Sequence, residues 1–160
     1  MINKNSKIYI AGHKGLVGSA ILKKLKLNGY KNILVLEKKK LNLLNQIEVF
    51  KFLTKEKPKF IFICAAKVGG IYSNIKYRAE YIYENITIQN NLIHGAFKAG
   101  VRNLIFMGTS CVYPRNSKQP MKENYLLSGY LEQTNEPYAI AKIAGIKMCE
   151  AYNARYNTNY

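Results

Sequence analysis

Cysteine is scarce in this chain, and its placement argues against two kinds of site. Three cysteines are spread widely over 160 residues, and no two of them are spaced as Cys-x-x-Cys. An odd number at such spacing does not predict a disulfide framework or a zinc site. We therefore expect no metal and a reducing, cytoplasmic environment.

Long apolar runs are also absent from the sequence. The runs that do occur are far shorter than the roughly 20 residues that cross a bilayer. The first residues, 1–7, are polar and stand directly before a predicted strand, unlike a secretory leader. Together these features predict a cytoplasmic chain with no membrane partner.

Acidic residues are few, since nine Asp and Glu stand against 25 Lys and Arg, a formal net charge of +16. A charge of this size raises the question of a nucleic-acid surface. Lysine far outnumbers arginine, however, and the basic runs at 38–40 and 55–59 fall in predicted connections or at helix ends. We interpret the charge as solvated surface and expect no nucleic-acid partner, although an anionic ligand would gain from the field.

Apolar segments alternate between two patterns along the whole chain. Short unbroken runs, typical of strands buried on both faces of a parallel sheet, occur at 7–11, 33–36, 60–64 and 103–107. Helical periodicity is found between and after them, at 16–28, 46–55, 77–99 and 137–156. This alternation predicts an α/β fold, a Rossmann-type doubly wound parallel sheet with helices on both faces.

The first predicted strand runs directly into a glycine-rich turn. Gly12, Gly15 and Gly18 follow it at regular spacing, and a helical pattern begins at Leu16. Strand, glycine turn and helix in this order predict a dinucleotide pocket, in which backbone approaches a pyrophosphate and the helix N-terminus faces the phosphates. The alternative is a tight strand–helix turn that binds nothing.

The residues after the second predicted strand bear on which dinucleotide the pocket accepts. Glu37 lies about 20 residues after Gly18, where an acid would hold the ribose diol of NAD. Lys38 follows at once and Lys14 lies inside the glycine loop, so two cations would meet the 2′-phosphate of NADP. We predict NADP; the alternative is that lysines 38–40 form a solvated turn.

Three groups suited to proton transfer occur near the end of the sequence. Thr109 follows the fourth predicted strand, and Tyr138 and Lys142 stand one turn apart on a predicted helix, on the same face. An ammonium beside a phenol favours the phenolate, so we expect Lys142 to lower the pKa of Tyr138. The phenol would then exchange a proton with a sugar oxygen that the Thr109 hydroxyl holds.

These motifs together resemble the extended short-chain dehydrogenase/reductase family. Within it, four segments are similar to the GDP-L-fucose synthases, which act on GDP-4-keto-6-deoxymannose; they are 11–18, 65–70, 110–114 and 135–142. The likeness covers nearly all of the chain, but such enzymes are about twice as long. We therefore expect residues 1–160 to form an NADP-binding Rossmann domain, incomplete at its C-terminal end and without the substrate domain.

The resemblance implies an NADPH-dependent enzyme that epimerises C3 and C5 of a GDP-sugar substrate and then reduces C4. Tyr138 and Thr109 would stabilise the enolate, Lys142 would bond the nicotinamide ribose, and Cys111 matches the base in epimerisation. The alternative for Cys111 is a packed thiol. The implied cofactor contacts are Gly12, His13, Lys14, Gly15, Leu16, Val17, Gly18, Lys38, Leu43, Ala65, Ala66, Met107, Gly108, Thr109, Ser110 and Lys142. Lys67 is either a ligand contact or solvated.

The same likeness implies a homodimer that pairs through helices 77–99 and 137–156. The sequence departs from the family at Thr109, where serine is usual, and the family's histidine acid would lie beyond residue 160. His13 and His94 do not replace it. Two other functions stay open: another NAD(P)-dependent sugar-nucleotide epimerase or dehydratase, and a non-catalytic nucleotide-binding module.

Overall fold

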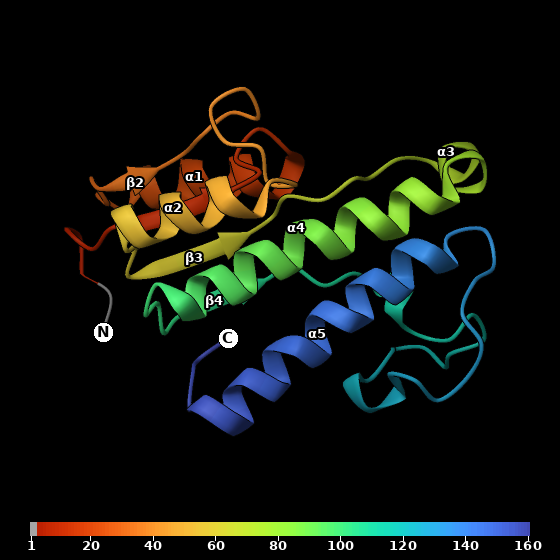
Figure 1. The fold of residues 1–160 in the computed structure, drawn as a ribbon. Helices are drawn as coiled ribbons and strands as arrows, with labels where there is room; N and C mark the ends of the chain where they lie inside the picture. Colours follow the sequence, from red (N-terminus) through yellow and green to blue (C-terminus); the bar gives the residue numbers. More distant parts are fainter. Residues whose placement is uncertain (1–2) are drawn as a thin grey trace.

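The computed structural model describes residues 3–160 and contains a parallel sheet packed against helices (Figure 1). The strands of the described chain are β1 (Ile8–Ala11), β2 (Ile33–Leu34), β3 (Phe60–Ile63) and β4 (Leu104–Phe106). Their order is β2-β1-β3-β4, and each neighbouring pair is parallel. The predicted α/β class with a Rossmann-like parallel sheet is confirmed.

Five α-helices connect and cover these strands in the described residues. They are α1 (Leu16–Leu27), α2 (Gln46–Glu56), α3 (Ile71–Lys76), α4 (Arg78–Lys98) and α5 (Glu136–Tyr156). Two short 3₁₀ helices, η1 (Ser110–Val112) and η2 (Glu123–Tyr125), lie between β4 and α5. The short helix α3 was not predicted, because only a break at Tyr77, with φ −115°, separates it from the long periodic pattern of α4.

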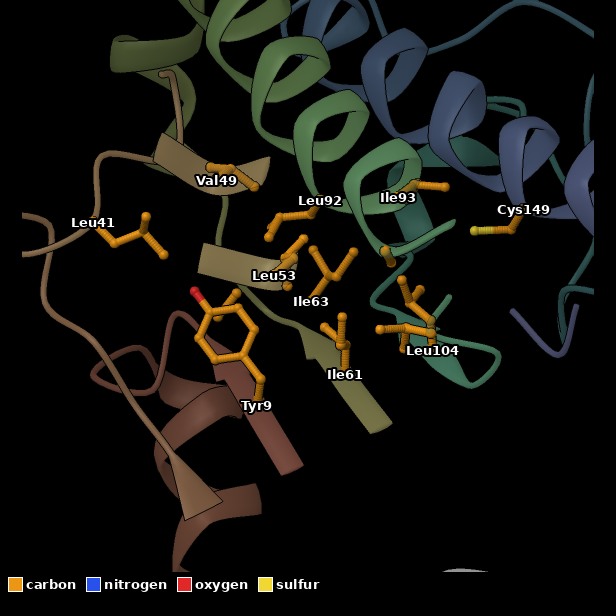
Figure 2. Close-up of a cluster of buried hydrophobic side chains, with 13 residues drawn as sticks. Tyr9, Leu41, Val49, Leu53, Ile61, Ile63, Leu92, Ile93, Leu104 and Cys149 are labelled. Atoms are coloured by element: carbon orange, nitrogen blue, oxygen red, sulfur yellow. The ribbon is translucent and has the colours of Figure 1, made fainter. Parts of the chain in front are cut away.

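The hydrophobic core lies between the sheet and helices α2 and α4 (Figure 2). Its fully buried members come from strands and helices alike, as the interior of an α/β layer structure requires. They include Tyr9, Val49, Leu53, Ile61, Ile63 and Leu92. The apolar runs that predicted the strands therefore supply one wall of this core, and the helical stripes supply the other.

Two glycines let α4 lie close to its neighbours. A Cβ added at Gly95 would stand 2.9 Å from the side chains of Leu53 and Phe50 on α2. A Cβ at Gly145 on α5 would stand 2.5 Å from the Phe106 ring. A Cβ at Gly145 would also stand 2.9 Å from the Gln89 side-chain oxygen on α4. Because neither glycine has room for a side chain, α2 and α5 pack closely on either side of α4 (Figure 1).

One sheet face is covered less completely than the other. Ile105 on β4 is 41% exposed, and Phe60 and Phe62 on β3 are only partly buried. Beyond β4, Asn159 forms an isolated parallel bridge with Asn103, which extends pairing past the named strands. Among residues 3–160, no helix has the length and apolar character needed to cross a membrane.

Candidate active site

A cleft of about 950 Å³ opens at the carboxyl ends of the strands. Its walls come from the loops that follow β1, β2, β3 and β4, and from two side chains of α5, Tyr138 and Lys142. The carboxyl edge is where open α/β sheets bind ligands, and pockets of this size hold small molecules and cofactors. The glycine loop after β1 and the pair Tyr138 and Lys142 on α5 lie over a hundred residues apart in the sequence, yet they line the same cleft.

The glycine loop between β1 and α1 shows why each glycine is needed. Gly12 has a φ of +87°, and a Cβ there would stand 2.6 Å from the Ala65 backbone nitrogen. A Cβ at Gly18 would stand 2.2 Å from the Gly12 carbonyl oxygen. At Gly15 a Cβ would meet only that carbonyl oxygen, at 3.5 Å, so the space above Gly15 is open. Packing demands Gly12 and Gly18, whereas Gly15 leaves room for a ligand.

The start of α1 suits an anion. Gly15 occupies the N-cap position, where no side chain caps the helix, and the first turn carries no acidic residue. The free N–H groups and the positive end of the helix dipole therefore favour a negatively charged partner. His13 lines the cleft beside them, and its Nδ1 atom is buried without a hydrogen-bond partner. These features fit the pyrophosphate of a dinucleotide.

Lys14 and Glu37 form an ion pair on the cleft wall. The Lys14 Nζ lies 2.6 Å from the Glu37 carboxylate, and both side chains are more than half exposed. The hydrogen bond and charge of Lys14 are the first causes that lower the pKa of Glu37. The acid expected for an NAD ribose is therefore already paired with a lysine expected for a 2′-phosphate. Lys38 lines the cleft next to them.

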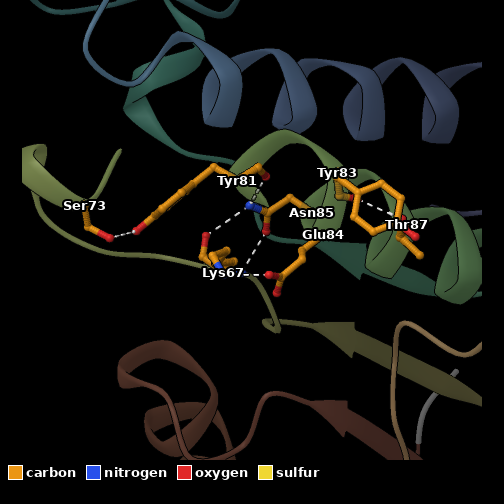
Figure 3. Close-up of polar contacts among 7 residues, drawn as sticks. All are labelled: Lys67, Ser73, Tyr81, Tyr83, Glu84, Asn85 and Thr87. Carbon is orange, nitrogen blue, oxygen red and sulfur yellow. Dashed lines mark hydrogen bonds and ion pairs between the residues drawn. The ribbon is translucent and has the colours of Figure 1, made fainter. Parts of the chain in front are cut away.

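The loop after β3 is held by a buried asparagine from α4 (Figure 3). The Asn85 Oδ1 accepts from the Lys67 backbone N–H at 2.8 Å, and its Nδ2 donates to the Lys67 carbonyl at 3.0 Å. The Lys67 ammonium is neither free nor simply solvated, because it lies 2.6 Å from Glu84. Sequence reasoning missed Asn85 and Glu84, since they lie within the helical pattern of α4 and their spacing indicated only packing.

Lys142 is almost completely buried at the base of the cleft. It is 3% exposed, and its Nζ donates to the Met107 carbonyl oxygen at 2.8 Å. Burial lowers the pKa of Lys142 to about 8. The ammonium stands 4.5 Å from the centre of the Phe106 ring and 6.0 Å from the centre of the Tyr138 ring.

The expected effect of Lys142 on Tyr138 is wrong for this structure. Burial raises the pKa of Tyr138, and the neighbouring Cys111 and Tyr81 raise it further. The physical reason for the rise is burial of the phenol, and the Lys142 ammonium does not offset it, since it donates to the Met107 carbonyl oxygen. Tyr138 is therefore a protonated phenol at neutral pH, suited to donate a hydrogen bond or a proton.

The segment after β4 lies beside the cleft. Thr109 precedes η1, and its hydroxyl oxygen accepts from the Cys111 backbone N–H at 3.4 Å. The Cys111 sulfur accepts from Asn135 Nδ2 at 3.2 Å, a contact that sequence reasoning also missed. Met107 and Gly108 line the cleft, but Thr109, Ser110 and Cys111 are not part of its lining. Their roles as site residues stay predictions.

The other predicted cofactor contacts fall on the cleft wall. The lining includes Gly12, His13, Lys14, Gly15, Leu16, Val17, Gly18, Lys38, Leu43, Ala65, Ala66 and Lys142. Their roles stay predictions as well. Within residues 3–160, no three His, Cys, Asp or Glu side chains lie close enough together to bind a metal ion.

Comparison with known proteins shows that the chain is similar to nucleotide-sugar enzymes. A family model described as "NAD dependent epimerase/dehydratase family" matches residues 8–160. Putative GDP-L-fucose synthase 2 of Arabidopsis thaliana is 50% identical over 98% of this chain and 48% of its own length. GDP-L-fucose synthase of Escherichia coli K12 is 49% identical over 96% of this chain and 48% of its own.

Solved structures of nucleotide-sugar enzymes are also similar to this chain. MlghC, a GDP-mannoheptose C4 reductase from Campylobacter jejuni with NADP bound, superposes with a TM-score of 0.96 at 45% sequence identity. The match covers 99% of this chain and 50% of that one. The chain spans about half the length of the curated relatives it matches.

Proposed function

The chain belongs to the NAD-dependent epimerase/dehydratase family, and we propose that it is the NADP-binding domain of a GDP-L-fucose synthase. In this role it serves in the 3,5-epimerisation and 4-reduction of GDP-4-keto-6-deoxymannose. The observation that carries the proposal is the single cleft that joins the open face of Gly15 to Tyr138 and Lys142. The identity of about half to synthases with that name supports the substrate class.

The residues of the cleft fit an NADP cofactor. The free N–H groups at the start of α1 and the open face of Gly15 receive the pyrophosphate. Lys14 and Lys38 would hold the 2′-phosphate, and the unpartnered His13 Nδ1 would gain a polar neighbour. When bound in its reduced form, NADP supplies the hydride for C4. Lys142, already buried beside the cleft, contacts the nicotinamide end.

The side chains near α5 divide the proton transfers. Cys111 removes a proton beside the ketone, and the charge that develops on the sugar oxygen is stabilised by hydrogen bonds from Tyr138 and Thr109. The raised pKa of Tyr138 keeps its phenol protonated, so Tyr138 also delivers the proton that the oxygen needs when C4 is reduced. Lys142 keeps an ammonium 6.0 Å from the centre of the Tyr138 ring, where it would favour negative charge on the phenol oxygen after the proton is delivered.

The cofactor site is tested by Gly15→Asp. Aspartate is a favoured N-cap residue, so this change should keep or strengthen α1 while it places a negative charge where the phosphates bind. We expect NADPH binding, followed by its fluorescence, to weaken by at least about tenfold, which is 1.4 kcal/mol. Ala20→Asp, exposed on the same helix, is the control. Equal NADPH affinity in Gly15→Asp and the unchanged chain would contradict the site.

The domain alone is expected to have little activity, so the reaction is tested with GDP-4-keto-6-deoxymannose and NADPH in a longer protein that joins this domain to a substrate domain. We expect loss of absorbance at the reduced nicotinamide band, and we expect Tyr138→Phe to abolish it. Epimerisation incorporates solvent deuterium at C3 and C5, whereas a GDP-sugar 4-reductase without epimerase activity leaves those positions unlabelled. The reductase is the second candidate, favoured by the likeness to MlghC.

A homodimer in the cytoplasm completes the proposal. Tyr83 on α4 and Ile140 on α5 are 67% and 41% exposed, which supports a contact between these helices and a second copy. The three cysteines are free thiols, which supports a reducing compartment. Sedimentation as a monomer at micromolar concentration would count against the dimer.

A further inference from the structure

Asn135 stands at the start of α5 but does not cap it. Asparagine is among the best N-cap residues because its side-chain oxygen accepts an N–H of the first turn. Here the N-cap position is Asn135, yet no side-chain cap bond is formed. The amide turns instead toward η1, where its Nδ2 donates to the Cys111 sulfur at 3.2 Å. The Asn135 side chain thus donates a hydrogen bond to the Cys111 thiol and makes none to the first turn of its own helix.

The rest of this amide has no partner within the described chain. The Asn135 Oδ1 atom is buried and makes no hydrogen bond, which is uncommon for a buried amide oxygen. Asn135 also provides the one side-chain hydrogen bond that the Cys111 sulfur receives from residues 3–160. The residue itself is only partly buried, so packing alone does not explain why its oxygen is left without a partner while its nitrogen donates to the sulfur.

The charges around this pair are balanced. Glu132 and Glu136, on either side of Asn135 in sequence, are bound by Arg115 at 3.1 Å and by Arg78 at 3.5 Å. Tyr138 faces Cys111 from α5, and Tyr81 approaches Tyr138 from α4 with ring centres 6.4 Å apart. Both glutamates that flank Asn135 are therefore paired with arginines. Among residues 3–160, the side-chain hydrogen bond to the sulfur comes from the Asn135 amide.

We propose that Asn135 is the positioning residue for Cys111, holding the sulfur in place and favouring its thiolate. A hydrogen bond donated to the charged form of an acid favours that form. This role rests on the proposed function of Cys111 as the epimerisation base. In that step a C–H bond beside the ketone breaks, an S–H bond forms, and the electron pair moves to the ketone oxygen as an enolate.

The thiolate is tested without any substrate by alkylation. Iodoacetamide reacts with thiolates, and mass spectrometry of the Cys111 peptide follows this one cysteine across pH 6 to 10. In Asn135→Ala we expect the midpoint of the alkylation profile to move up by about one pH unit, so that alkylation at pH 7 slows roughly tenfold. In Asn135→Asp, which keeps the size but places a carboxylate beside the sulfur, we expect a larger upward shift.

Two controls separate this effect from loosening of the chain. Asn90→Ala, exposed on α4, should leave the Cys111 profile unchanged. Cys149 is 7% exposed, so its alkylation reports on opening of the fold. An unchanged Cys111 midpoint in both Asn135 variants, with Cys149 still protected, overturns the proposal.

Substrate exchange then separates this inference from the proposed function. In a longer protein that joins this domain to a substrate domain, with GDP-4-keto-6-deoxymannose in deuterium oxide, Asn135→Ala should slow label uptake about tenfold while the Kd for NADPH stays the same. A shifted alkylation profile with no label uptake even in the longer protein without the substitution would reject the epimerase function but keep the thiolate contact. Normal uptake in Asn135→Ala would overturn the positioning role.

Discussion

The Lys142 ammonium is almost completely buried, so its protonation affects the free energy of unfolding. Burial lowers its pKa from 10.5 to about 8 in the native chain. Between those values the unfolded chain binds more protons than the native chain, so the free energy of unfolding rises with pH across this window. Below about pH 8 the buried ammonium destabilises the native chain by its full amount, and this destabilisation is relieved as the pH rises from about 8 to 10.5.

We therefore predict a pH-dependent difference between the unchanged chain and Lys142→Met, which keeps the length and the apolar stem. From pH 8 to 9.5 the unchanged chain should gain about 2 kcal/mol relative to Lys142→Met, measured by urea unfolding. Burial raises the pKa of Cys149 to about 11, which acts with the opposite sign but is common to both proteins. A constant difference across the window would contradict a buried ammonium.

Glu37 forms an ion pair with Lys14, and this pairing limits how well the Lys14 ammonium can bind a phosphate. Replacing it by glutamine removes the negative charge and frees the Lys14 ammonium, which is paired at 2.6 Å. We predict that Glu37→Gln binds NADPH a few-fold more tightly and NADH more weakly, because a 2′-phosphate gains a cation and a ribose diol loses an acceptor.

The ratio of the two Kd values is the measurement, with Lys51→Ala, exposed on α2, as a charge-change control. A Glu37→Gln protein with an unchanged NADPH-to-NADH ratio would show that the ion pair does not face the adenosine ribose.

At the scale of elements, the crossing of α4 and α5 depends on Gly145. In an exposed helix position, Gly→Ala usually stabilises by about 1 kcal/mol. At Gly145 the new Cβ would stand 2.5 Å from the Phe106 ring and 2.9 Å from the Gln89 side-chain oxygen. Gln89 is itself engaged, since its Nε2 donates to the Ala141 carbonyl at 2.7 Å. We predict that Gly145→Ala lowers the free energy of unfolding by about 1–3 kcal/mol.

Thermal unfolding measures this change, and Ala144→Gly, exposed one residue earlier, provides the matched comparison. That variant should lose only the propensity difference of about 1 kcal/mol. If Gly145→Ala were instead more stable than the unchanged chain, the helices would have room that the structure does not contain.

At the scale of the whole molecule, the partly covered sheet face predicts self-association. Ile105 is 41% exposed and lies near the half-buried pair Phe60 and Phe62, whose ring centres are 5.0 Å apart. Apolar surface of this kind favours contact with other apolar surface. We predict that Ile105→Thr lowers the binding of a hydrophobic fluorescent dye and the light scattering of concentrated protein solutions. The midpoint of urea unfolding should change little.

Val101→Thr is the comparison, since Val101 is 3% exposed and the same change there should destabilise the chain. Unchanged scattering in Ile105→Thr would assign the association to another surface.

Patterns that depend on neighbouring residues were visible in the sequence. The apolar runs predicted all four strands because parallel strands are buried on both faces, and the long period of 77–99 predicted α4. The glycine spacing predicted the β1–α1 turn, because Gly12 needs a positive φ and Gly18 has no room for a Cβ. The turn spacing of Tyr138 and Lys142 likewise put both on one cleft wall.

Contacts between distant residues were decided by the tertiary structure alone. The bond from Lys142 to Met107 joins residues 35 apart. Burial raises the pKa of Tyr138, although its spacing from Lys142 predicted a lower value. The bonds from Asn135 to Cys111 and from Asn85 to Lys67 span 24 and 18 residues. Strand order sets which loops meet at the sheet edge, and close packing sets how far each charge is buried. Local sequence therefore determined the strands, the long helices and most of the residues that line the cleft. Only the assembled sheet determined the protonation and the partners of those residues.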